Sequence, residues 1–66
     1  MMEFNVHVSI VDGQMMVVKV SSAHATEPKT VYSRTALHPE HYLTDGLSAA
    51  NEFILRSIES FKPANR

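Results

Sequence analysis

The sequence predicts a small α+β domain of two layers, a β-β-β-α arrangement in which one C-terminal helix lies across a sheet. Residues 4–10 alternate between apolar and polar side chains, as a half-buried strand does, and an Asp-Gly pair typical of hairpin turns separates them from a second apolar run. Residues 45–61 carry apolar side chains at the spacing of one helical face. The chain has 66 residues, so we expect a single domain over residues 1–62 and a flexible tail over 63–66.

The predicted antiparallel hairpin pairs residues of about 3–10 with residues of about 14–21. We expect a three-residue loop, Val11-Asp12-Gly13, because its third position requires the left-handed conformation that glycine adopts at little cost. A two-residue Asp12-Gly13 turn would instead place Val6 opposite a lysine and would spoil the apolar face. The preferred register pairs Phe4 with Val20, Val6 with Val18 and Val8 with Met16.

A short third strand is predicted over residues 30–35, which include β-branched and aromatic residues. The preceding segment, 21–29, has the composition of a loop, and Pro28 cannot continue a central strand. Alternation along this strand predicts two sides, with Val31 and Ser33 on one and Tyr32 and Arg34 on the other.

The segment LHPEHY, residues 37–42, is predicted to form a separate helical turn. Pro39 suits its first position, because the N–H that proline lacks would be unpaired there. Glu40 then lies in the first turn, where a negative charge interacts favourably with the helix dipole. Gly46 is expected to separate this turn from the main helix or to kink the chain between them. The side chains expected to dock the turn are Leu37, Tyr42 and Leu43.

The main amphipathic helix is predicted over about 45–61, with Thr44 or Asp45 as its N-cap. Pro63 follows the last turn, where a helix is expected to stop. The apolar stripe consists of Leu47, Ala50, Ile54, Ile58 and Phe61, with Phe53 beside it. The opposite face consists of Asp45, Ser48, Glu52, Arg56 and Glu59.

The amino-acid composition indicates the cellular compartment in which the chain works. It contains no cysteine, which rules out disulfides and thiolate metal sites and fits a reducing compartment. No apolar run approaches the roughly 20 residues that cross a bilayer, and the first ten residues lack the features of a signal peptide. We therefore expect a cytoplasmic protein. The formal net charge of −1 provides no overall attraction to nucleic acid or to an anionic membrane.

Histidine is the residue type that raises the question of a metal. His38 and His41 are three residues apart and can share one face of a helix. Zinc requires at least a third protein ligand, and the candidates His24, Glu40 and Asp45 stand at no recognised spacing. We favour a helix start over a metal site, so no cofactor is predicted. His38 and His41 remain the candidate ligands of a third hypothesis, a histidine-based metal-binding protein.

No arrangement of residues predicts catalysis. The chain shows no nucleophile next to an orienting base, and its two glycines cannot form a phosphate-binding loop. We predict a non-enzymatic protein-binding module, a homodimeric regulator or inhibitor that occupies a surface of another protein, of the type found among phage and mobile-element accessory proteins. The predicted contact residues are Met15, Val17 and His7 on the mixed face of the hairpin, and Leu55 beside the helix stripe.

The alternative function is a nucleic-acid-binding module, because strands of a small sheet can enter a groove of DNA. Its candidate contacts are Lys19, Lys29, Arg34, Arg56, Lys62 and Arg66. Six basic residues are offset by seven acidic ones, and aromatic and basic residues do not interleave. We therefore expect an ordinary solvated surface at these positions.

Overall fold

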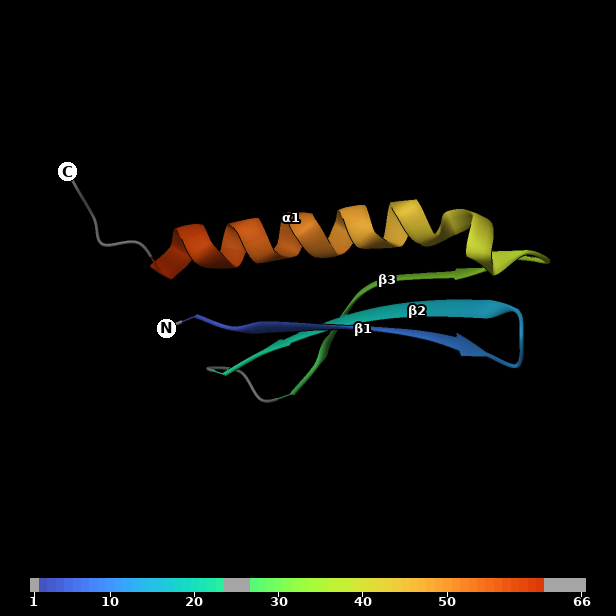
Figure 1. The fold of residues 1–66 in the computed structure, drawn as a ribbon, viewed down its shortest axis with the longest axis horizontal. Helices are drawn as coiled ribbons and strands as arrows, with labels where there is room; N and C mark the ends of the chain where they lie inside the picture. The colour runs from blue at the N-terminus through green and yellow to red at the C-terminus, as the bar shows by residue number, and fades with distance from the viewer. Residues whose placement is uncertain (1, 24–26, 62–66) are drawn as a thin grey trace.

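A computed structural model describes residues 2–23 and 27–61 of the chain. It contains a three-stranded antiparallel sheet followed by one long helix, which confirms the predicted α+β arrangement (Figure 1). The elements in chain order are β1 (Phe4–Val11), β2 (Met15–Ser22), β3 (Lys29–Thr35), the 3₁₀ turn η1 (Pro39–Tyr42) and α1 (Leu43–Phe61).

The strand order is β1-β2-β3, so β2 is the central strand and both β1 and β3 are edges. The helix α1 lies along one face of the sheet, which we call the inner face (Figure 1). No described helix or strand covers the other, outer face (Figure 1). The domain therefore has two layers, and its apolar core must lie between α1 and the inner face.

The hairpin register differs from the prediction by two residues. Val6 pairs with Val20, Val8 with Val18 and Ile10 with Met16. A shift of two residues keeps each side chain on its face, so the predicted apolar face is retained while its cross-strand pairs are wrong. The observed register places Ile10 opposite an apolar residue, whereas the predicted one would have placed it opposite Gln14.

The turn accounts for this shift. Asp12 and Gly13 both have positive φ angles, 55° and 71°, and the N–H of Gln14 donates to the carbonyl oxygen of Val11 over 3.1 Å. Two consecutive residues with positive φ are typical of a type I′ turn, which aspartate and glycine both tolerate. The three unpaired residues are therefore 12–14 rather than the predicted 11–13.

A β-bulge in β3 overturns the predicted sidedness of Val31. Val18 pairs with Tyr32 but the next residue, Lys19, pairs with Thr30, so Val31 is the extra residue between them. Because a bulge breaks the alternation of side chains, Val31 and Tyr32 both pack against the core. Ser33 lies opposite Val17 on the outer face, so it does not share a side with Val31 as predicted.

The core is small. The core cluster consists of Met16, Val18, Val20 and Ala50, each 3% exposed or less. Gly46 is also buried, and a Cβ at this position would stand 2.8 Å from Cγ2 of Val18. The predicted break at Gly46 is therefore wrong: glycine lies inside the continuous helix α1, where it allows the helix to approach β2 closely.

The helical turn η1 begins as predicted, with Pro39 in its first turn after His38. Tyr42 packs against the core, but Leu37 is 79% exposed and does not dock the turn. The turn runs directly into α1 at Leu43. Thr44 and Asp45 therefore lie inside the first turn of the helix rather than before it.

Some predictions fall on residues that the structure does not describe. These are the predictions on His24, on the side chain of Phe61, on Lys62, Pro63 and Arg66, and on the tail 63–66. Within the described ranges, no helix has both the length and the apolar character needed to cross a membrane.

Candidate protein-binding surface

The helix α1 covers β2 and β3 but leaves the inner face of β1 uncovered. A helix is about 10 Å wide and strands are spaced about 4.8 Å apart, so one helix spans about two strands. The connection between β3 and η1 is short, residues 36–38, and it starts the helical segment beside β3. The helix then packs on Met16, Val18 and Tyr32, the side chains nearest to Gly46.

An apolar strip follows from this placement. The residues Val6, Val8 and Ile10 of β1 share the inner face with the buried residues of β2, yet each is 42–47% exposed. Leu43 and Leu47 of α1 are 40% and 45% exposed. We call these five residues the inner apolar strip.

The two leucines of the strip lie on the flank of α1 that faces β1. The other flank is identified by Ala49 and Phe53, which line a groove with residues 29–31 of β3. At 100° per residue, Leu47 lies about 160° around the helix from Ala49 and Leu43 lies about 120° from it. The strip is therefore continuous from β1 to the near side of the helix.

Among residues 2–23 and 27–61, no charged side chain lies on this side of the molecule. The strand β1 contains no lysine, arginine, aspartate or glutamate. The charged residues of α1 project from the outward side or from the flank near β3, according to their helical angles. They are Asp45, Glu52, Arg56 and Glu59. Nothing in the strip would leave a charge unpaired if a protein surface covered it.

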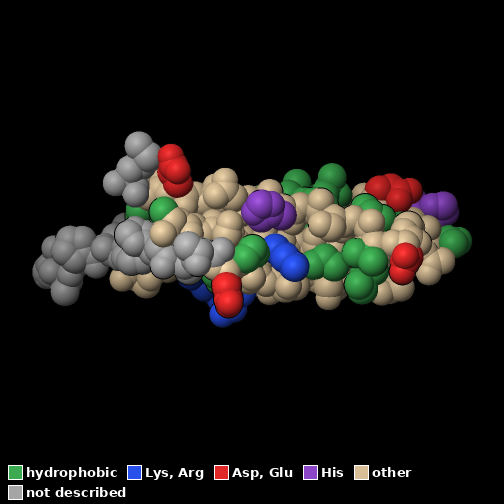
Figure 2. All heavy atoms as spheres, turned by 90° about the horizontal axis from the view of Figure 1, so that it is seen from below, with side chains coloured by type: hydrophobic (Ala, Val, Ile, Leu, Met, Phe, Trp, Pro, Cys, Tyr) green, Lys and Arg blue, Asp and Glu red, His purple; other side chains and the backbone are tan. Residues whose placement is uncertain are grey.

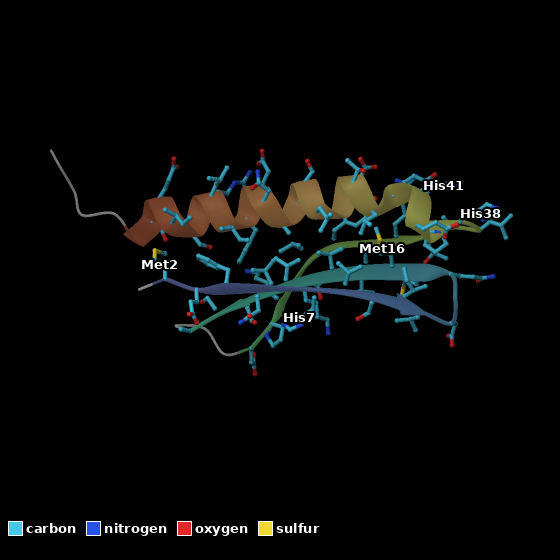
Figure 3. All side chains as sticks on the ribbon, in the orientation of Figure 1. Met2, His7, Met16, His38 and His41 are labelled. Carbon is cyan, nitrogen blue, oxygen red and sulfur yellow. The ribbon has the colours of Figure 1, made fainter. Side chains whose placement is uncertain are left out.

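The four predicted contact residues do not form one surface. Met15 and Val17 lie on the outer face of the sheet, 37% exposed and half-buried respectively. His7 is exposed on the same face, and its Nε2 lies 3.5 Å from the Ser21 hydroxyl oxygen (Figure 3). Leu55 is 52% exposed on the side of α1 that points away from the sheet. A partner that contacts Leu55 would not reach the outer face of the sheet.

The sequence interpretation missed the strip because it assigned the inner face of β1 to the core. The number of predicted strands and helices nonetheless indicated an exposed strand. The prediction set three strands, two of them with an apolar face, against a single helix, and one helix cannot cover three strands. One edge strand therefore had to keep its apolar residues exposed.

The predicted histidine pair lies at the N-terminal end of the helical segment (Figure 3). The ring centroids of His38 and His41 are 5.2 Å apart, and His38 Nδ1 lies 3.5 Å from Glu40 Oε2. Among the described residues, no three histidine or carboxylate side chains surround one point. The geometry thus offers two neighbouring imidazoles and one carboxylate that contacts His38 alone.

Basic residues are dispersed over the molecule. Lys19 lies on the outer face, which carries charged side chains of both signs (Figure 2). Lys29 lies at the groove between β3 and α1, which has a volume of about 340 Å³, and its Nζ stands 6.0 Å from the Phe53 ring centroid. Arg56 borders the same groove and lies 3.6 Å from Glu52. These positions do not form a basic stripe of the kind that binds a phosphate backbone.

The guanidinium group of Arg34 packs against an aromatic side chain. Its guanidinium carbon lies 4.0 Å from the ring centroid of Tyr42, which connects β3 to η1. The pKa of Arg34 is raised, chiefly by the nearby Tyr32 side chain. The buried Tyr32 hydroxyl makes no hydrogen bond to the described residues, so its effect on Arg34 comes from proximity.

Comparison of the chain with protein-family models, with curated proteins and with solved structures found no match.

Proposed function

We propose that the chain is a non-enzymatic, cytoplasmic protein-binding module that works as a homodimer and regulates or inhibits another protein by occupying part of its surface. The observation that supports this proposal is the inner apolar strip. Five branched side chains, all 40–47% exposed, lie together without a charge among them. Contiguous apolar surface of this kind on a small soluble domain marks a site of protein contact.

A second copy of the chain is a suitable partner for this surface. It offers the same uncharged strip, so an isologous contact places apolar side chains against apolar side chains. Self-association also compensates for a core cluster that has four buried residues within the described part of the chain. Domains of this size commonly rely on such additional contacts for stability.

The inner apolar strip is too small to hold a specific dimer together by itself. Covering side chains that are a little under half exposed removes roughly 300–400 Å² of apolar surface per copy. Two copies then bury less than the about 1,000 Å² that a specific interface exceeds. Further contacts must therefore contribute to the dimer.

The test measures the solution mass by light scattering over a range of concentrations, for the natural chain and for two matched variants. Val8→Glu places a charge in the strip, and Leu55→Glu places the same charge at an apolar position of similar exposure on the far side of α1. We expect a dimer for the natural chain and for Leu55→Glu. Val8→Glu should raise the dissociation constant roughly tenfold or more, because two like charges would meet across the contact.

The helical circular dichroism of both variants should match that of the natural chain, since neither position is buried. A natural chain that stays monomeric at every concentration contradicts the proposed homodimer. Equal weakening by both variants would also contradict it, because the contact would then not involve the strip.

A further inference from the structure

We infer that β1 pairs edge to edge with β1 of a second copy, antiparallel and centred on His7, so that the dimer contains one six-stranded sheet. This inference rests on the proposed homodimer and specifies its geometry. Its starting point is the difference between the two edges of the sheet.

The edge formed by β1 has none of the features that prevent strands from pairing. It is eight residues long, contains no charged residue and no proline, and pairs with β2 without a bulge. Native proteins usually protect long edge strands with charges, prolines or bulges. An edge without such protection is suited to pairing with another strand.

The edge formed by β3 carries these protective features. It contains two cations, Lys29 and Arg34, and it has a bulge at Val31. Pro28 directly precedes it. Because the strands belong to the same sheet, this difference indicates that β1 is the edge used for association.

The inner apolar strip restricts the symmetry of the pair. A two-fold axis perpendicular to the sheet places both helices on the same side, so opposite residues of the two β1 strands must belong to the same face. Since side chains alternate along a strand, the numbers of opposite residues must add to an even number. The axis can therefore pass at a residue but not between two residues.

The apolar residues of β1 select the position of that axis. With the axis at His7, Phe4 lies opposite Ile10 of the second copy, and Val6 lies opposite Val8. All four inner residues of the strand then have an apolar partner. With the axis at Val8, Phe4 would lie opposite Asp12, which belongs to the turn. The register centred on His7 therefore makes more of the favourable cross-strand pairs.

Edge pairing also provides the further contacts that the dimer needs beyond the strip. Edge pairing adds backbone hydrogen bonds along β1 to the apolar contacts of the side chains. Each α1 lies over β2 and β3, so the two helices would be four strand spacings, or roughly 20 Å, apart. The two strips would form one apolar floor between them, about as wide as one helix. Edge pairing covers only those sides of the strip residues that meet where the two β1 strands adjoin, and the upper side of this floor remains for the target protein.

The test uses single cysteines, because the natural chain contains none. His7→Cys places a thiol on the axis, where opposite Cβ atoms are about 4.5–5.5 Å apart and a disulfide needs little adjustment. Val8→Cys places the thiols on a diagonal, roughly 7–8 Å apart. Ser33→Cys, exposed on the outer side of β3, is the control for random collision.

Each variant is oxidised with glutathione disulfide at a concentration where light scattering has established the mass of the natural chain. We expect His7→Cys to form covalent dimer roughly tenfold or more faster than Ser33→Cys, because association raises the effective thiol concentration to the millimolar range. Val8→Cys should be slower than His7→Cys.

The outcomes separate this inference from the proposed function. A natural chain with dimer mass whose His7→Cys variant crosslinks no faster than Ser33→Cys overturns the pairing of β1 but leaves the homodimer intact. Faster crosslinking at position 8 than at position 7 overturns the register. A natural chain that is monomeric throughout overturns both the homodimer and its geometry.

Discussion

Gly46 of α1 lies against Val18 of β2 so closely that a Cβ at position 46 would stand 2.8 Å from Cγ2 of Val18. The neighbouring contacts are Met16 Cε at 3.2 Å and Tyr32 Cδ2 at 3.4 Å. This approach places the helix directly on β2 with its other flank over β3, and it contributes to which strands the helix covers. The exposure of the inner apolar strip is thus in part a consequence of where Gly46 meets Val18.

Gly46→Ala should lower the free energy of unfolding by roughly 1 kcal/mol, measured by urea denaturation. Alanine gains about 1 kcal/mol of helix propensity over glycine, but its methyl group overpacks against a stiff valine at a cost of about 1–3 kcal/mol. In a Val18→Ala background the same substitution should be neutral or stabilising, since the opposing methyl groups are gone. Equal effects in the two backgrounds would show that the contact does not limit the packing.

Met16→Ala and Met15→Ala form a matched pair of adjacent substitutions in β2. Met16 is fully buried and Met15 is 37% exposed on the opposite face. We expect Met16→Ala to lower the free energy of unfolding by roughly 2–4 kcal/mol, enough to unfold much of a domain this small, and Met15→Ala to cost well under half of that. Similar losses at the two positions would mean that the outer face is also covered, and thermal unfolding followed by circular dichroism measures the difference.

Two substitutions in the hairpin turn should change the stability of the fold in opposite directions. Gly13→Ala should destabilise the fold by about 1 kcal/mol, because φ at this position is 71° and alanine rarely adopts it. Asp12→Asn should stabilise the fold by a few tenths of a kcal/mol, since Asn-Gly is a preferred pair in type I′ turns. Denaturant midpoints of both variants against the natural chain provide the measurement. A stabilising Gly13→Ala would rule out the observed turn.

Arg34→Gln should lower the melting temperature more than Arg56→Gln does. Arg34 stacks 4.0 Å from the centroid of the Tyr42 ring and so holds η1 on β3, whereas Arg56 makes a 3.6 Å exposed ion pair with Glu52 within the helix. Exposed helical ion pairs contribute little, so Arg56→Gln serves as the control for loss of one positive charge. The order of the two melting temperatures is the result that decides this prediction.

Zinc should not raise the melting temperature of the chain. His38 and His41 are neighbours, but the described residues provide no group of three ligand-type side chains around them. A ligand that binds the folded state alone would stabilise it in proportion to its concentration over its dissociation constant. A rise in melting temperature with zinc that a chelator reverses, and that His41→Ala abolishes, would establish the metal site.

Local patterns in the sequence were sufficient to predict the elements and their faces. The alternation around Val6 and Val8 identified β1 and its apolar face, and helical spacing identified α1 to within two residues at its start. These features depend on which side of one strand or helix a residue occupies, and that depends on residue spacing alone. The helix start at Pro39 is local in the same sense, because proline constrains its own backbone.

The tertiary structure decided how these elements pair and pack against one another. The register moved by two residues because cross-strand pairing of Ile10 and the positive φ of Asp12 both contribute to it. Gly46, which reads as a break in the sequence, became the point of closest approach because Val18 lies beneath it. The exposure of β1 followed from the width of one helix and from the short connection that starts it beside β3, and neither is encoded in the pattern of β1 itself.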